Sequence, residues 1–86
     1  MKEETFKATT SRGREMEVTV GIKNENYGWF ELYDEETGGE YIYAEGGLWF
    51  AEHEGETCLT DYDGVFELPD YVMNKLAEWG YNVDWI

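Results

Sequence analysis

The sequence predicts an α+β fold: an antiparallel β-meander of five to six strands with one C-terminal helix packed on one face. Three observations lead to this prediction. Apolar and polar residues alternate with the period of two that half-buried strands require. Short clusters of Gly, Asn, Asp and Ser separate these runs. One segment near the C-terminus has apolar residues at helical spacing.

The first two strands are expected in the N-terminal part of the chain. Residues 6–10 alternate between apolar and polar side chains, and residues 15–22 do so more clearly. Ser11-Arg12-Gly13-Arg14 forms the turn between them, because Gly13 can adopt a positive φ. Residues 24–28 then interrupt the alternation.

Further strands are expected at short intervals in the rest of the chain, at residues 29–33, 41–44, 48–51 and 57–60. Residues 34–39, Asp-Glu-Glu-Thr-Gly-Gly, are suited to a hairpin loop between the third and fourth strands. Gly46-Gly47 is interpreted as the turn between the fourth strand and the fifth.

The helix is expected to begin after Leu68. Pro69 suits the first helical position, and Asp70 complements the positive end of the helix dipole. Three apolar residues follow at helical spacing, namely Val72, Leu76 and Trp79. Gly80 is expected to end the helix. A helix of about eleven residues cannot cover a sheet of five or six strands, so one face is left open to solvent or to a partner.

Charge is distributed unevenly along the chain. Residues 1–23 contain four acids and five bases, a net charge of +1, while residues 24–86 contain sixteen acids and one base, a net charge of −15. The acidic part also holds fourteen of the fifteen aromatic residues. Such a surface repels nucleic acid and anionic lipid but attracts basic proteins. The predicted partner is therefore a basic protein surface, that of a nucleic-acid-binding protein, with no direct binding to nucleic acid or membrane.

The candidate binding surface is the face on which acids and aromatic residues alternate. On the third strand, Trp29, Glu31 and Tyr33 point away from the apolar side, as Tyr41 and Tyr43 do on the fourth. The predicted partner-binding residues are Trp29, Glu31, Tyr33, Asp34, Glu35, Glu36, Glu40, Tyr41, Tyr43 and Glu45. Tyr and Trp are frequent interface anchors. The alternative is a solvated face whose acids serve only solubility.

Mimicry of DNA by this face depends on charge density. Duplex DNA carries roughly one charge per 110 Å² of its surface. A charge of −14 spread evenly over the about 5,300 Å² of a folded chain of this size gives only one per about 380 Å². The mimic hypothesis therefore requires the acids to cluster on one face.

No constellation predicts catalysis, and we expect neither an enzyme nor a cofactor. Asp61-Tyr62-Asp63-Gly64 lacks the ligand spacing of a calcium loop and is interpreted as an Asx turn. His53 has no second histidine or cysteine pair with which to bind a metal and is expected in an exposed turn. Cys58 is interpreted as a small buried hydrophobic residue rather than a nucleophile.

The segments Trp29–Phe50 and Asp61–Pro69 resemble small uncharacterised proteins of bacteriophages and integrated elements. In size and acidity the chain also resembles phage inhibitors of host defence or repair, a type that includes anti-CRISPR proteins, anti-restriction proteins and uracil-DNA glycosylase inhibitors. The resemblance implies a protein that acts in the cytoplasm of a bacterial host cell. The lone cysteine and the lack of a long apolar run or signal pattern are consistent with that location.

These observations predict a single acidic domain, residues 1–86, that acts as a nucleic-acid-mimicking inhibitor of a host nucleic-acid-binding protein. A first alternative is an adaptor or self-assembling domain, such as a homodimer, whose charge serves solubility. A second alternative is a binder of a small molecule or carbohydrate through the tryptophans.

Overall fold

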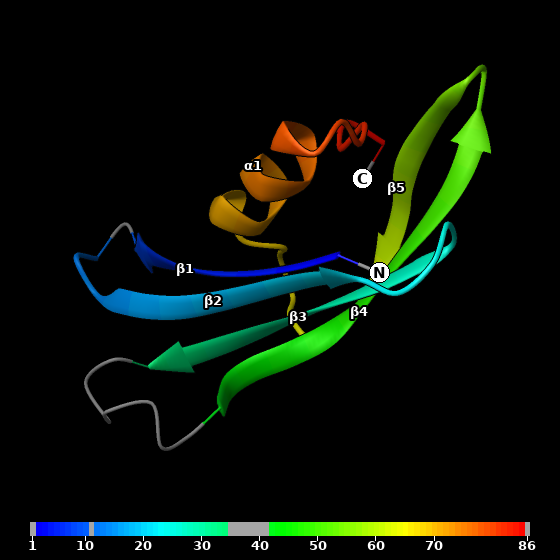
Figure 1. Ribbon diagram of the computed structural model, residues 1–86. Helices are drawn as coiled ribbons and strands as arrows, with labels where there is room; N and C mark the ends of the chain where they lie inside the picture. The colour runs from blue at the N-terminus through cyan, green and yellow to red at the C-terminus, as the bar shows by residue number, and fades with distance from the viewer. Residues whose placement is uncertain (1, 11, 35–41, 86) are drawn as a thin grey trace.

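The computed structural model describes residues 2–10, 12–34 and 42–85, with backbone alone at residues 42 and 43 (Figure 1). Its elements are β1 (Lys2–Thr9), β2 (Glu15–Ile22), β3 (Tyr27–Asp34), β4 (Ile42–His53), β5 (Glu56–Tyr62) and α1 (Asp70–Glu78). The strands form one sheet in the order β1-β2-β3-β4-β5, and all neighbours are antiparallel. The prediction of an α+β meander with a C-terminal helix is confirmed.

The turn predicted at Gly46-Gly47 is wrong, and the predicted fourth and fifth strands are the single strand β4. Neither glycine is among the residues with positive φ. A Cβ at Gly46 would lie 2.0 Å from the carbonyl oxygen of Asp63, and one at Gly47 would lie 2.7 Å from the ring of Trp49. The two positions lack side chains because a backbone segment and an aromatic ring occupy the space.

The turn lies instead at Glu54-Gly55, between β4 and β5. Both residues have positive φ, 50° at Glu54 and 82° at Gly55. A two-residue loop with this geometry matches the twist of an antiparallel hairpin. His53 is exposed, as predicted, but it is the last residue of β4 rather than part of the turn.

The hydrophobic core lies between the sheet and α1. From the sheet it takes Met16, Val18, Val20, Ile22, Phe30, Leu32, Leu48, Phe50 and Leu59. Val72 and Leu76 of α1 are fully buried against them, and Trp79 is half-buried at the margin. The helix begins at Asp70, so Pro69 is its N-cap rather than its first residue. Among the described residues, no helix is long and apolar enough to span a bilayer.

Lys75 ties α1 to the edge strand β1. Its ammonium pairs with the carboxylate of Glu4 on β1 and with Glu78 on the helix, the latter at 2.9 Å. The same Nζ lies 4.9 Å from the centre of the Phe6 ring. A second cation, Lys2 on β1, lies 4.7 Å from the Trp79 ring centre. These bases are therefore engaged on the helix side of the sheet.

The C-terminal tail lies along the opposite edge of the sheet. The amide of Asn82 donates to the carbonyl of Thr57 at 2.9 Å, and its carbonyl accepts from the amide of Leu59 at 2.8 Å. The tail thus forms a parallel bridge to part of β5. At the other edge of the sheet, β1 has no strand on its outer side among the described residues.

Candidate partner-binding face

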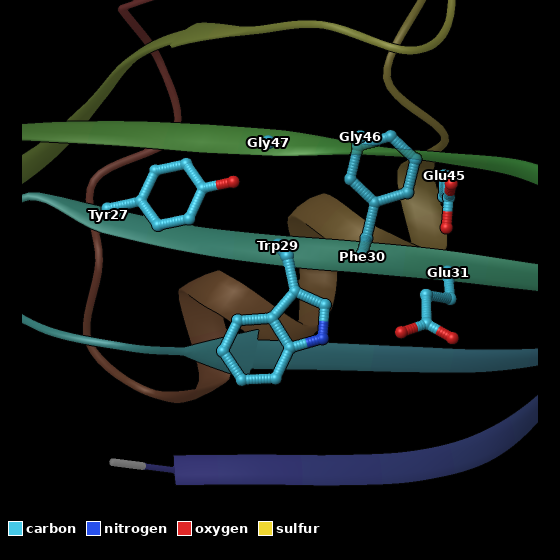
Figure 2. A pocket seen from close by; sticks show the side chains of 7 residues that line it. All are labelled: Tyr27, Trp29, Phe30, Glu31, Glu45, Gly46 and Gly47. Atoms are coloured by element: carbon cyan, nitrogen blue, oxygen red, sulfur yellow. The ribbon is translucent and has the colours of Figure 1, made fainter.

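The sheet surface opposite α1 carries the predicted aromatic and acidic residues. On β1 to β4, the strand register places Glu3, Thr5, Lys7, Thr9, Glu15, Glu17, Thr19, Gly21, Tyr27, Trp29, Glu31, Tyr33, Glu45, Gly47 and Trp49 on this side, and this four-stranded surface is here called the open face. Figure 2 views part of it, with the helix behind the sheet. Alternation along β3 is regular: Phe30 and Leu32 are buried in the core, while Trp29, Glu31 and Tyr33 are half-buried on the open face.

Negative charge clusters on the open face. Of its described residues, five are acids (Glu3, Glu15, Glu17, Glu31 and Glu45) and one is a base (Lys7), a net charge of −4. Four strands about 4.8 Å apart and about 26 Å long cover roughly 500 Å². The density is then about one charge per 125 Å², close to the roughly 110 Å² of duplex DNA. The clustering that mimicry requires is thus present in this part of the sheet.

Two of these acids face each other directly. Glu31 on β3 is the register partner of Glu45 on β4. Side chains at such positions have Cβ atoms about 5 Å apart, and like charges placed there destabilise the sheet. Glu17, on the neighbouring strand β2, adds a further negative charge close to this pair. The arrangement favours a cation between the two carboxylates.

Tyr33 shows the electrostatic effect of this cluster. Its hydroxyl donates a hydrogen bond to Oε2 of Glu31 at 2.5 Å. This bond raises the pKa of Tyr33 above 10.0, with further contributions from desolvation and from the charges of Glu31, Glu45 and Glu17. The tyrosine therefore stays neutral and holds one end of the Glu31 carboxylate in place.

The aromatic rings on the open face lie over glycines. A Cβ at Gly21 would lie 2.2 Å from the Trp29 ring, so the indole packs on the bare backbone of β2. Trp49 covers Gly47 in the same way, and its ring meets that of Tyr27 edge to face at 5.4 Å between centres. Glycine thus lets each ring lie close to the sheet surface.

A hollow of about 350 Å³ lies among these groups, lined by Tyr27, Trp29, Phe30, Glu31, Glu45, Gly46 and Gly47. Figure 2 shows the rings of Tyr27 and Trp29 nearly face on. Both carboxylates lie at one end of the hollow, and the Tyr27 hydroxyl and the Trp29 indole nitrogen point toward that end. The site joins flat apolar surfaces to two negative charges.

The structure brings together four of the ten predicted site residues: Trp29, Glu31, Tyr33 and Glu45. Asp34 belongs elsewhere, because it faces the core side, is only 5% exposed and pairs with Arg14. Its carboxylate is therefore not offered to a partner. Five predicted residues cannot be placed: Glu35, Glu36, Glu40 and Tyr41 lie outside the described residues, as does the side chain of Tyr43.

Sequence reasoning missed Tyr27, Glu17 and Trp49. The sequence predicts that Tyr27 lies in an interruption of the strand pattern, yet it continues the alternation Tyr27-x-Trp29-x-Glu31 that defines the open face of β3. Glu17 alternates with the apolar residues of β2, which indicated its face but not its neighbour Tyr33. Trp49 lies in an apolar run, Leu48-Trp49-Phe50, where alternation gives no signal.

Cys58 and His53 differ in their exposure to solvent. Cys58 is 1% exposed, and burial raises the pKa of its thiol, with a smaller contribution from the charge of Glu56. His53 is exposed, and its ring contacts Trp85 at 4.9 Å between centres. In the parts of the chain that the structure describes, no three His, Cys, Asp or Glu side chains converge as a metal site.

Comparison with models of protein families, with curated proteins and with solved structures finds no match to this chain.

Proposed function

We propose that the protein is a non-enzymatic binder of a basic protein surface, which it engages through the open face, and that it inhibits a nucleic-acid-binding protein by occupying that protein's nucleic-acid site. The observation that carries the proposal is the charge density of the open face, about one net negative charge per 125 Å² on the described strands. A surface at nearly the charge density of DNA competes with DNA for the same Lys and Arg side chains.

Two further features support contact with a protein. Tyr27, Trp29 and Trp49 supply rigid aromatic surface of the kind that dominates binding energy at interfaces. The bases of the chain lie mainly away from this surface: Lys2 and Lys75 are engaged on the helix side, and Arg14 pairs with Asp34. A basic partner therefore meets little repulsion on the open face.

The test is capture from a bacterial lysate with three baits: the native chain, a face variant with Glu17, Glu31 and Glu45 changed to Gln, and a matched variant with Glu25, Glu52 and Glu67 changed to Gln. Both variants lose three charges, but only the first loses them from the open face. We expect the native and matched baits to retain one nucleic-acid-binding protein that elutes as salt rises and that the face variant does not retain.

Competition then decides whether the captured protein is inhibited at its nucleic-acid site. A labelled 20-base-pair duplex bound to the purified partner should be displaced by the native chain and not by the face variant. Simultaneous binding of the chain and the duplex would contradict mimicry. Retention of the partner by the face variant would contradict the assignment of the open face.

A second candidate function, self-assembly, is favoured by the free edge of β1. This strand is eight residues long and largely exposed, and an edge of this kind can pair with the same edge of a second copy. Light scattering across a range of protein concentrations tests it. Self-assembly is supported if the chain forms a homodimer that is weakened by Thr5→Lys but not by the double change Glu31→Gln and Glu45→Gln. A chain that stays monomeric at all concentrations would contradict it.

A further inference from the structure

We propose that the hollow between Tyr27, Trp29, Glu31 and Glu45 receives the guanidinium group of one arginine side chain from the basic partner, a role that depends on the proposed function of the open face. The hollow would then be the point at which the partner is recognised by shape, whereas the rest of the face attracts it by charge.

The aromatic lining favours a flat cation. Trp29 lies against the backbone at Gly21, so one side of its indole is packed on β2, and the residue as a whole is half-buried (Figure 2). Tyr27 is held by its edge-to-face contact with Trp49, at 5.4 Å between ring centres. A guanidinium stacks on such rings through cation–π attraction and planar contact.

The carboxylates provide the matching acceptors. Glu31 and Glu45 are register partners, so a cation between them relieves a like-charge contact present in the free protein. Tyr33 donates to Oε2 of Glu31, which orients this carboxylate. An arginine lying over the rings would direct its N–H groups toward the end of the hollow where both carboxylates lie.

Other occupants fit these groups less well. An ammonium can pair with the carboxylates, but it lacks the planar surface that matches the rings. A neutral sugar would leave the two opposed charges uncompensated. A bare divalent ion would make no use of Tyr27 and Trp29, which form much of the lining.

The experiment compares nona-arginine with nona-lysine, two peptides of equal charge, by calorimetric titration of the native chain. We expect nona-arginine to bind roughly five- to tenfold more tightly. Changing Glu31 and Glu45 to Gln should reduce this ratio toward one. The matched control, Glu3 and Glu15 changed to Gln, removes the same charge from the same face and should weaken both peptides while keeping the ratio.

Tyr27→Leu provides a second variant that retains every charge, and it too should reduce the ratio. Amide signals of Gly46 and Gly47 and the indole signal of Trp29 should shift on addition of nona-arginine. Equal affinity for both peptides in the native chain would overturn the arginine site and leave the proposed function standing. Failure of both peptides to bind would overturn both proposals, and equal shifts of these signals with Mg²⁺ alone would assign the hollow to a metal ion instead.

Discussion

At the scale of single residues, glycine has two distinct uses in this sheet. Gly55 has a φ of +82° with no atom within 4 Å of a Cβ built there, so it serves backbone conformation alone. Gly46 has no positive φ, but a Cβ there would lie 2.0 Å from the backbone oxygen of Asp63. A side chain at Gly55 would cause moderate backbone strain, whereas a side chain at Gly46 would collide with the backbone of Asp63.

Gly46→Ala is therefore expected to destabilise the protein by about 2 kcal/mol or more, because backbone must move to admit the methyl group. Gly55→Ala is the control, with an expected cost of about 1 kcal/mol from its left-handed backbone. Denaturant unfolding of the two variants measures the difference. Equal costs would show that the approach of Asp63 to β4 is easily relaxed.

Tyr33 gives a prediction for the electrostatics of the open face. Its pKa is raised above 10.0 chiefly by the hydrogen bond to Glu31. Glu31→Gln removes the charge and weakens the bond, so the pKa of Tyr33 should fall toward its ordinary value. A titration followed by NMR of labelled tyrosine measures it, with Glu52→Gln as a variant in which the pKa should not change. An unchanged pKa after Glu31→Gln would contradict the contact.

Residue-level prediction from sequence succeeded where alternation was regular. The period of two in β3 correctly placed Trp29, Glu31 and Tyr33 on one face, and the same period places Asp34 on the other. Grouping Asp34 with the exposed acids ignored that alternation. Its burial is stabilised by Arg14, which directly precedes the neighbouring strand β2, and pairing across strands follows from register rather than from local sequence.

At the scale of elements, α1 is held over one end of the sheet by both apolar and charged contacts. Val72 and Leu76 are buried in the core, and Lys75 pairs with Glu4 of β1 and with Glu78. The hydrogen bonds to these carboxylates raise the pKa of Lys75 above its ordinary value of 10.5, against a smaller opposing contribution from burial. The edge strand is thus fastened to the helix by a partly buried cation.

This pKa predicts how stability depends on pH. Because the folded-state pKa of Lys75 is raised, its contribution is complete below the unfolded-state value of about 10.5 and is lost as pH rises through the folded-state value. Between about pH 9 and 11.5, the Tm of the native chain should fall more than that of Lys75→Met. Lys23→Met, a change at an exposed turn, should follow the native curve. Parallel curves for the native chain and Lys75→Met would contradict the prediction.

The sequence predicts where one strand ends and the next begins when the turn between them requires a residue with positive φ. Gly13 has a φ of 80° between β1 and β2, as expected. The pair Gly46-Gly47 has the same sequence signature as a turn, but its cause is the proximity of Asp63 and Trp49, which come close only in the folded sheet. Sequence therefore indicated five or six strands and could not show that β4 is continuous.

At the scale of the whole molecule, the net charge of −14 has opposite effects on folding and on binding. Self-repulsion among the acids destabilises the compact chain, and the same field attracts a basic partner. Salt screens both interactions.

We therefore expect the Tm of the free protein to rise between about 0.02 M and about 0.5 M NaCl, while affinity for nona-arginine falls over the same range. Thermal unfolding and calorimetry measure the two trends. The variant with Glu17, Glu31 and Glu45 changed to Gln should show a smaller rise in Tm. A Tm that falls with salt would show that ion pairs such as Lys75 with Glu4 outweigh repulsion.

The bridge between Asn82 and β5 has a consequence for aggregation in the cell. A sheet with two available sides can add copies without limit and grow into a fibre. Here the C-terminal tail bonds to Thr57 and Leu59 and covers part of β5, whereas β1 has no strand on its outer side among the described residues. If two copies pair through β1, both of these open edges are used, and the partly covered β5 edges then limit the addition of further strands.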